Sequence, residues 1–291
     1  LFKGNPLVKG DLFKSLMETN KLADDKNLKV GVGLFRRHMP SYLDAMEKLH
    51  DGQVGKIQFL RCYCNMNSWG ARERQPGMSE LEYQVRNWRV FDWLGGGRLV
   101  EAHFHELDVM DWAMNGHPVE CNGMGGRTVL SSEPRFGTDY DHHFHEYTYG
   151  DGTKMYSQCR QLNGCWGPMS EHVHTDKTVI DLLGKIRISN VRDRKQEVVN
   201  PYRQEHVDLL EGIWNDKPYN EGWFGATSSF TSILGREAGY SGQVVRWDEL
   251  AEKGPALFPA DLTWDSDPPV KPDENGSYEH LVPIPGIYRP S

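Results

Sequence analysis

The N-terminal part of the chain alternates between helical and extended patterns of hydrophobic positions. Apolar side chains recur at helical spacing in residues 11–23 and 41–50, and Gly52 follows the second segment as a helix-ending glycine. The apolar runs at residues 28–35 and 57–64 are short enough to be buried strands. A helix followed by such a strand is typical of the end of a βαβ series, so residues 2–8 are expected to end the preceding strand.

The middle of the chain changes from a helix to successive strands. Residues 107–114 carry apolar side chains at the spacing of one buried helix face. Four extended runs follow, at residues 119–130, 140–149, 154–162 and 170–188. The turn Asp151-Gly152 is a hairpin signal, and consecutive strands with short turns predict a mostly antiparallel sheet. Residues 204–216 and 227–240 predict two further helices.

Two long segments follow neither pattern. Residues 65–93 show no clean period and are rich in Arg, Trp, Glu and Gln. A loop of that length is uncommon inside a compact domain and is often functional, with a solvated insertion as the alternative. Half of the sixteen prolines fall after residue 254, which predicts an extended tail on the surface.

Composition excludes several classes of partner. A net charge of −8 and a pI near 5.8 argue against nucleic acid, and no apolar run is long enough to span a membrane. The five cysteines form no CxxC pair and are expected to be reduced, structural thiols. The alternative is a Cys159–Cys165 disulfide in an oxidising compartment.

The strongest candidate chemistry lies in residues 95–112, GGGRLVEAHFHELDVMDW. Glu101 and His105 are four residues apart, so on a helix they would share a face. A carboxylate beside an imidazole can orient the ring for general acid/base work, and a solvated helix surface is the structural alternative. His103 would face away from His105 on a helix but would share its face in an extended segment.

A second group of histidines lies in DHHFHEY, residues 141–147. On a strand, His143 and His145 point to one face, and His142 and Glu146 to the other. Two such histidines can ligate a transition metal, whereas a polar sheet face or an intersubunit contact is the more ordinary role. No metal site is predicted.

Three stretches, taken in order, resemble the Gfo/Idh/MocA family of nicotinamide-dependent sugar and polyol oxidoreductases. VGVGLFRRHMPSYLDAMEKLHDGQVGKI, residues 30–57, is similar to the family's last Rossmann strand and first substrate-domain helix. GGGRLVEAHFHELDVMDWAM, residues 95–114, resembles the motif GG.L.D.G.H..D. ILGREAGYSGQVVRWDEL, residues 233–250, resembles the family's closing helix and its TGQ..TWDE-like end.

The resemblance implies a role for each matching residue. His105 falls on the family's catalytic histidine, and Asp108 falls on the aspartate after it. Glu101 falls where the family has an aspartate, so its side chain is longer by one methylene. His103 replaces a common glycine, which implies a more crowded and polar site. The side chains expected to hold the substrate are Arg86, Asn87 and Trp88 in the long segment, Arg36 and Arg37 at the domain junction, and Arg160 on a strand, where a sheet-face ion pair is the alternative.

The chain departs from the family most at its front. It contains no GxGxxG fingerprint, and the family's Glu-Lys-Pro motif would align with Gly4-Asn5-Pro6, leaving weak cofactor contacts at Asn5 and Pro6. We expect the complete protein to use NAD or NADP. This chain, as a fragment or a divergent member, is expected to bind neither well and to be inactive alone.

The implied fold is α+β: a large, mostly antiparallel sheet covered by helices, similar to the C-terminal domain of dihydrodipicolinate reductase. The last strand–helix–strand of a Rossmann fold would precede it. Residues 1–36 would be the Rossmann remnant, residues 37–253 the substrate and oligomerisation domain, and residues 254–291 the proline-rich tail.

The resulting hypothesis is the substrate-binding and catalytic-base part of an oxidoreductase acting on a sugar or polyol hydroxyl, with Glu101 orienting His105. A homo-oligomer formed through the sheet is expected. One rival is a metal-dependent hydrolase or lyase built from His103, His105, His143 and His145, and the other is a non-catalytic sheet scaffold. The lack of a signal-like segment favours the cytoplasm, with export as the alternative.

Overall fold

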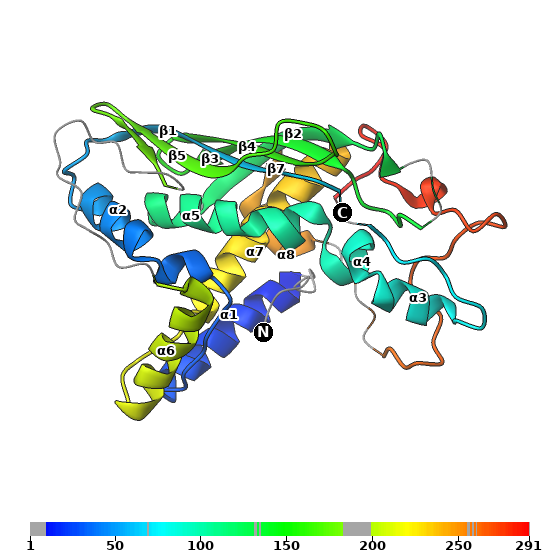
Figure 1. Cartoon of the computed structure of the whole chain (residues 1–291), viewed down its shortest axis with the longest axis horizontal. Coiled ribbons are helices and arrows are strands. Elements are labelled where there is room, and N and C mark those ends of the chain that lie inside the picture. Colours follow the sequence, from blue (N-terminus) through cyan, green and yellow to red (C-terminus); the bar gives the residue numbers. More distant parts are fainter. Residues whose placement is uncertain are drawn as a thin grey trace.

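The computed structural model describes residues 10–68, 70–130, 133, 135–182, 199–254, 257, 259 and 261–290. Within these residues lies a seven-stranded sheet in the order β6-β5-β1-β4-β3-β2-β7 (Figure 1). Neighbouring strands are antiparallel, except that β1 and β4 run parallel. The strands are β1 (Ile57–Met66), β2 (Pro118–Gly126), β3 (His142–Tyr149), β4 (Lys154–Gln161), β5 (Met169–Thr175), β6 (Val179–Asp181) and β7 (Val245–Arg246). The predicted α+β class with a mostly antiparallel sheet is confirmed.

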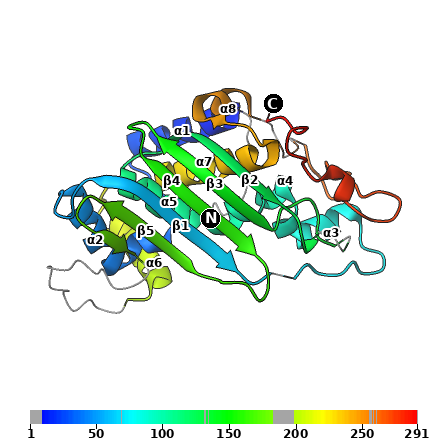
Figure 2. The same ribbon diagram turned by 90° about the horizontal axis from the view of Figure 1, so that it is seen from above.

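The sheet has one face covered by helices and one bare face (Figures 1 and 2). Side chains alternate along β4, where Met155, Ser157 and Cys159 are buried and the residues between them are partly exposed. The buried side chains pack against α5 (Phe104–Met114), α7 (Gly222–Ser241) and α2 (Pro40–His50) to form the main core. The predicted hairpin turn lies between β3 and β4, with Gly152 at a φ of 86°.

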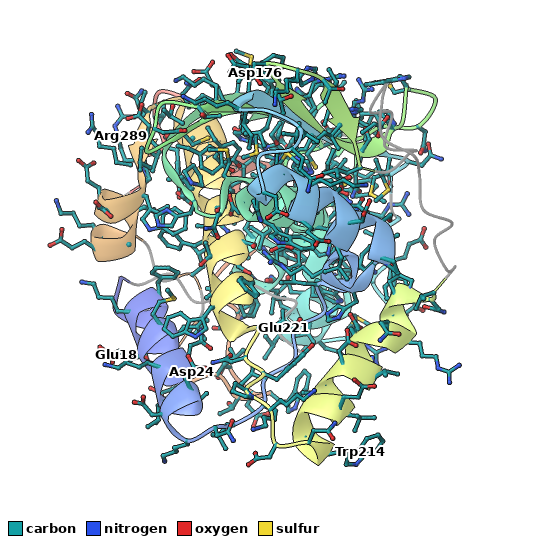
Figure 3. The ribbon with its side chains drawn as sticks, turned by 90° about the vertical axis from the view of Figure 1, so that its left-hand side faces the viewer. Glu18, Asp24, Asp176, Trp214, Glu221 and Arg289 are labelled. Carbon is teal, nitrogen blue, oxygen red and sulfur yellow. The ribbon has the colours of Figure 1, made fainter. Side chains whose placement is uncertain are left out.

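Three further helices lie on the helical side of the sheet, two long and one short. These are α1 (Gly10–Asp25), α6 (Pro201–Trp214) and α8 (Trp247–Lys253). Figure 3 shows Asp24 and Trp214 at the ends of α1 and α6, far from Asp176 at the sheet. Phe13 of α1 stacks on Phe230 with ring centroids 4.3 Å apart, which joins α1 to the core. The helices predicted at residues 11–23, 41–50, 204–216 and 227–240 are confirmed, and no helix in the described ranges is long and apolar enough to cross a membrane.

The strand predicted at residues 28–35 is wrong. That segment forms a single isolated bridge, between Val30 and Asn220, and ends in the 3₁₀ helix η1 (Phe35–His38). Its apolar pattern has another cause, because Val32 and Leu34 are buried in a small cluster with Phe104. Burial without a neighbouring strand gives the same hydrophobic run as a strand does. The strand predicted at residues 2–8 lies outside the described residues.

The segment without a clean period, residues 65–93, is partly helical. It contains α3 (Glu80–Arg86), η2 (Trp88–Val90) and α4 (Asp92–Gly95). Oγ of Ser79 accepts the backbone N–H of Glu82, which fits an N-terminal capping box that the sequence displays as S-x-x-E. The buried members of this segment form a second core, with the proline-rich tail packed on it through Tyr278.

The described part of the tail packs on the rest of the molecule as an irregular chain with one 3₁₀ turn, η5 (Glu279–Leu281). The hydroxyl of Tyr140 donates to the backbone oxygen of Pro283 at 2.6 Å, and that of Tyr288 to Glu237 at 2.7 Å. The long strand predicted at residues 170–188 divides after Thr175 into β5 and β6 because a turn intervenes; residues 183–188 lie outside the described ranges.

Candidate functional site

The turn that leads into α5 depends on glycine. Gly96 and Gly97 have left-handed φ values of 76° and 81°, and a Cβ on Gly96 would lie 2.8 Å from Val100. The chain then enters η3 (Leu99–His103), which is π-helical, and continues into α5. A π turn is rare and often occurs at a functional site. It also means that the α-helical spacing assumed for this segment does not hold throughout it.

Glu101 lies in the π turn and His105 in the first turn of α5. Oε1 of Glu101 is 3.3 Å from Nε of Arg89, and its Oε2 is buried without a hydrogen-bond partner among the described residues. His105 is partly buried, with its ring edge-on to Phe35 at a centroid distance of 5.0 Å. Phe35 in turn stacks on Tyr202 of α6 at 4.7 Å. Glu101 is therefore paired with Arg89, and its orienting role toward His105 stays a prediction.

His103 points into the core between α5 and the sheet. It is fully buried, and its Nε2 lies 2.6 Å from Oγ of Ser157 and 3.7 Å from Sγ of Cys62. Its Nδ1 lies 3.2 Å from Oε2 of Glu106. The structure thus places this imidazole in the core rather than at an open surface, and a substrate contact for His103 stays a prediction.

A buried ion network continues from His103 toward the helices. Nη2 of Arg36 donates to Oε1 of Glu106 at 2.5 Å, and its Nε lies 3.2 Å from Oε1 of Glu171. The hydroxyl of Tyr42 donates to Oε2 of Glu171 at 2.9 Å. Arg36 therefore stabilises two carboxylates between η1 and the sheet. Sequence reasoning missed Glu106, although its spacing of three residues from His103 was visible; nothing comparable pointed to Glu171.

The two carboxylates of this network have pKa values shifted in opposite directions. Burial acts to raise the pKa of Glu106, but Arg36 and then His103 outweigh it and hold that pKa at about 2. Burial dominates at Glu171 and raises its pKa to about 7, against the opposing effect of Arg36. For His103, burial acts to lower the pKa, while Cys62, Cys64 and Glu106 raise it well above its usual value. Glu106 is accordingly the fixed negative charge of the network.

Arg37 serves a different part of the helical layer. Its guanidinium binds Asp108 through two nitrogens at 2.9–3.2 Å and lies 3.9 Å above the ring centroid of Phe224. It borders a cavity of about 230 Å³ together with Trp112 and Asp111. The two arginines predicted at the domain junction are thus side by side in sequence but bound to separate carboxylates.

The residues predicted to hold a sugar divide into surface and interior positions. Arg86 is exposed and pairs with Glu82 at 2.8 Å. Asn87 is buried, and its amide bonds the backbone of Arg72 and Tyr83. The guanidinium of Arg89 lies 4.8 Å above the ring centroid of Trp88. Asn87 therefore ties the segment together, whereas Arg86 and Trp88 remain substrate predictions.

Arg160 lies on the bare face of the sheet. Its Nη2 donates to the backbone oxygen of Trp166 at 2.6 Å, and no carboxylate in the described chain lies within ion-pair distance of it. The predicted alternative of a sheet-face ion pair is therefore not what the structure contains. The predicted cofactor contacts Asn5 and Pro6 lie outside the described residues.

The histidine metal centre considered as a rival is not assembled. His143 and His145 lie on the inner face of β3 and His142 on the outer face, as the strand period predicts. Among the residues that the structure describes, one group of three potential ligands has its donor atoms within 4.8 Å of one another, namely Cys64, His103 and Glu106. Because Arg36 already neutralises Glu106, this group does not need a cation. All five cysteines are thiols, with only Cys165 exposed.

No family model matches the sequence. One curated protein, 2,7-anhydro-N-acetylneuraminate hydratase from Mediterraneibacter gnavus, is 32% identical over 107 residues. That match covers 37% of this chain and spans only a quarter (25%) of the hydratase.

The likeness in three dimensions is broader. Scyllo-inositol dehydrogenase from Lactobacillus casei, solved with NAD(H) and scyllo-inositol, matches with a TM-score of 0.59 at 14% identity, over 81% of this chain and 70% of its own. The chain therefore shares the fold of this inositol dehydrogenase over the part that the match covers. Myo-inositol 2-dehydrogenase from Lactobacillus plantarum matches likewise, with a TM-score of 0.59 at 17% identity over 81% and 69% of the two chains. At these identities the likeness concerns the fold, and it confirms the predicted resemblance at that level.

Proposed function

We propose that the chain is the substrate-binding part of a nicotinamide-dependent oxidoreductase that acts on a sugar or polyol hydroxyl. The observation that carries the proposal is the placement of His105. This imidazole stands in the first turn of α5, partly exposed, in a chain whose fold is that of inositol dehydrogenases. A metal-dependent reaction has less support, because the predicted histidines do not converge.

In the proposed reaction His105 accepts the proton of the substrate hydroxyl. Phe35 and Phe104 pack against its ring at centroid distances of 5.0 and 4.9 Å, so the imidazole is held by apolar contacts. The carboxylate of Glu101, paired with Arg89 at 3.3 Å, is the proposed acceptor for a second substrate hydroxyl. A polar acceptor and an ordered base are what a polyol substrate requires.

A nicotinamide dinucleotide does not fit the described cavity between residues 31–33 and α6. That cavity, of about 240 Å³, is bordered by residues 31–33, by Glu205 and Glu221, and by His206 and Leu209 of α6. Acidic side chains repel a diphosphate, and the glycine-rich turn that usually binds one is absent from the sequence. The cofactor of the proposed reaction, NAD or NADP, would therefore need groups other than these.

The bare face of the sheet supports the proposed homo-oligomer. It carries exposed apolar side chains, including the cross-strand partners Met124 and Phe144, on the side that no described helix covers (Figure 2). Exposed apolar side chains gathered on one face are typical of a protein–protein contact. Sedimentation equilibrium of the full chain tests this part, and a monomer at all concentrations would reject it.

The reaction is tested on the full-length protein with NAD(H), NADP(H) and a panel of polyols that includes myo-inositol and scyllo-inositol. We expect His105→Ala to lower kcat by about 10²- to 10⁴-fold, with little change in cofactor affinity. His280→Ala, at an exposed position in η5, is the matched control and should retain full activity. Equal turnover by His105→Ala and wild type would reject His105 as the base.

A further inference from the structure

His38, the last residue of η1, lies between two carboxylates that belong to different helices. Its Nδ1 is 2.5 Å from Oδ2 of Asp208 in α6, and its Nε2 is 3.0 Å from Oε1 of Glu221, the residue before α7. The His38 side chain is only 5% exposed. An imidazole carries a hydrogen on both ring nitrogens only when it is protonated, so this ring can donate to both carboxylates only as a cation. Protonated His38 therefore ties η1 to α6 and to the start of α7.

The groups around this imidazole are mainly acidic. Three carboxylates and one phenol lie around the ring, those of Asp208, Glu205, Glu221 and Tyr219. Arg36 and Arg37 of η1 are bound to other carboxylates, and the exposed ring of His206 bonds the backbone of its own helix. Burial acts to lower the pKa of His38, but Glu221 and Asp208 outweigh it and raise that pKa above 6.5. The protonated ring thus neutralises part of an acidic group.

Apart from this ion pair, α6 buries little of itself on the described chain. Gly212 is the one buried residue of the helix, and among the described elements α6 packs mainly against η1. A cavity of about 240 Å³ remains between α6 and residues 31–33. A helix with few buried contacts separates from its neighbours at a small cost in free energy. The position of α6 therefore depends on a small number of side chains, with His38 among them.

The same helix also contributes to the surroundings of His105. Tyr202, in the first turn of α6, stacks on Phe35 with ring centroids 4.7 Å apart, and Phe35 packs edge-on against His105 at 5.0 Å. Phe35 and His38 are the two ends of η1, which is four residues long. The clamp at His38 and the aromatic contact at Phe35 therefore hold α6 against opposite ends of one short element.

We propose that protonated His38 is a positioning residue that docks α6 beside Phe35 and His105. When the ring loses a proton, one of the two carboxylates faces a nitrogen lone pair instead of an N–H donor, and α6 separates from η1. Because the pKa of His38 is higher with α6 docked, docking is fully present below pH 6.5 and is lost as pH rises through the raised value. The docking itself does not depend on the proposed function, whereas its effect on turnover rests on the role proposed for His105.

Hydrogen exchange of the full chain, followed by mass spectrometry, tests the docking. Exchange is expressed as a protection factor, which removes the intrinsic dependence of amide exchange on pH. Protection in α6 should fall above pH 6.5 by at most about tenfold per pH unit, the slope for release of one proton. The largely buried α7 is the internal reference and should keep its protection. Constant protection of α6 up to about pH 9, or a parallel fall in α7, would overturn the proposal.

Substitutions separate the charge of His38 from its shape. His38→Gln and Asp208→Asn should each lower α6 protection by about tenfold or more at pH 6.5. His38→Lys, which stays charged to a pKa of about 10, should keep α6 protected where wild type has lost it. Glu211→Gln is the matched control for Asp208→Asn, because Glu211 is an exposed carboxylate of the same helix.

Two results with the variants would contradict the role of the charge. These are unchanged α6 protection in His38→Gln, and a loss in folded His38→Lys as large as that in His38→Gln. If His38→Lys does not fold, the pH series of wild type and His38→Gln decide.

Turnover of the full-length protein tests the second step. We expect kcat of wild type to fall above pH 6.5 together with α6 protection, His38→Gln to lower kcat by about tenfold, and His38→Lys to restore it. Full kcat in a variant whose α6 has lost protection would reject His38 as a positioning residue. Absence of turnover in every form would count against the function proposed for His105, and the exchange results would still decide whether His38 docks α6.

Discussion

Oε2 of Glu106 lies 3.2 Å from Nδ1 of His103, and neither side chain is exposed to solvent. The same carboxylate accepts Arg36 through its other oxygen. The carboxylate of Glu106, the residue after His105 in α5, therefore links His103 of the π turn to Arg36 of η1. A buried charge of this kind is tolerated only when its partners are all in place.

Replacing Glu106 is expected to destabilise the fold strongly. Glu106→Gln leaves the guanidinium of Arg36 beside Glu171 alone and removes the charge that faces His103, so we expect a loss of about 3–5 kcal/mol in the free energy of unfolding. Glu82→Gln is the matched control, because Glu82 pairs with Arg86 at the surface and should cost less than about 1 kcal/mol. Urea denaturation measures both, and similar losses would contradict the buried-network interpretation.

Two inward histidines of β3 make stability depend on pH. Burial lowers the pKa of His145 from 6.5 to about 3 and that of His143 well below its usual value. A histidine whose pKa is lower in the folded state takes up its proton on unfolding, so stability is lost as pH falls below 6.5. We expect His145→Gln to reduce the number of protons taken up on unfolding by about one between pH 6.5 and 3. The free energy of unfolding should therefore fall less steeply as the pH is lowered. The slope of the urea midpoint against pH measures this effect, and an unaltered slope in His145→Gln would refute the assignment.

The sequence predicted those elements whose pattern has one physical cause. The strands β1 to β4 follow the alternation of buried and exposed side chains, and α7 follows its helical period to the left-handed Gly242. Residues 28–35 misled because a buried irregular segment carries the same apolar run as a strand. The helix α3 was missed although Ser79 and Glu82 displayed a capping box, because the apolar period over seven residues is too short to register.

The candidate site was less predictable than the fold. His105 could be singled out from its motif, but its contact with Phe35 depends on how η1 packs against α5, a distance of 70 residues along the chain. The prediction that Glu101 and His105 share a helix face assumed α-helical spacing. Nothing in the sequence indicates that Leu99–His103 is a π turn, so that assumption could not be tested from the sequence. The sequence around Arg36 likewise did not indicate that this side chain is buried between Glu106 and Glu171.

Asp111 is expected to behave as a neutral acid at neutral pH. Burial raises its pKa to about 8, and Tyr149 and Thr231 contact its two oxygens at 2.9 and 2.6 Å. A carboxyl group with a raised pKa stabilises the fold at low pH and loses that contribution as pH rises through the folded value. Asp111→Asn should therefore gain stability relative to wild type between pH 4 and 8. Asp108→Asn, which loses its pair with Arg37, should be destabilised throughout, and parallel curves for wild type and Asp111→Asn would rule out the raised pKa.

The turn at Gly96 can be tested against a second glycine with the same backbone conformation. Gly96 has a φ of 76° and Gly276 a φ of 79°, but a Cβ at Gly96 would lie 2.8 Å from Val100, whereas nothing lies within 4 Å at Gly276. Gly276→Ala should cost only the left-handed penalty of about 1–2 kcal/mol. Gly96→Ala should cost more, because the branched Val100 side chain in the π turn must also move, and that shift carries Glu101 with it. Thermal unfolding separates the two terms, and equal losses in the two variants would mean that the contact with Val100 places no constraint on the start of α5.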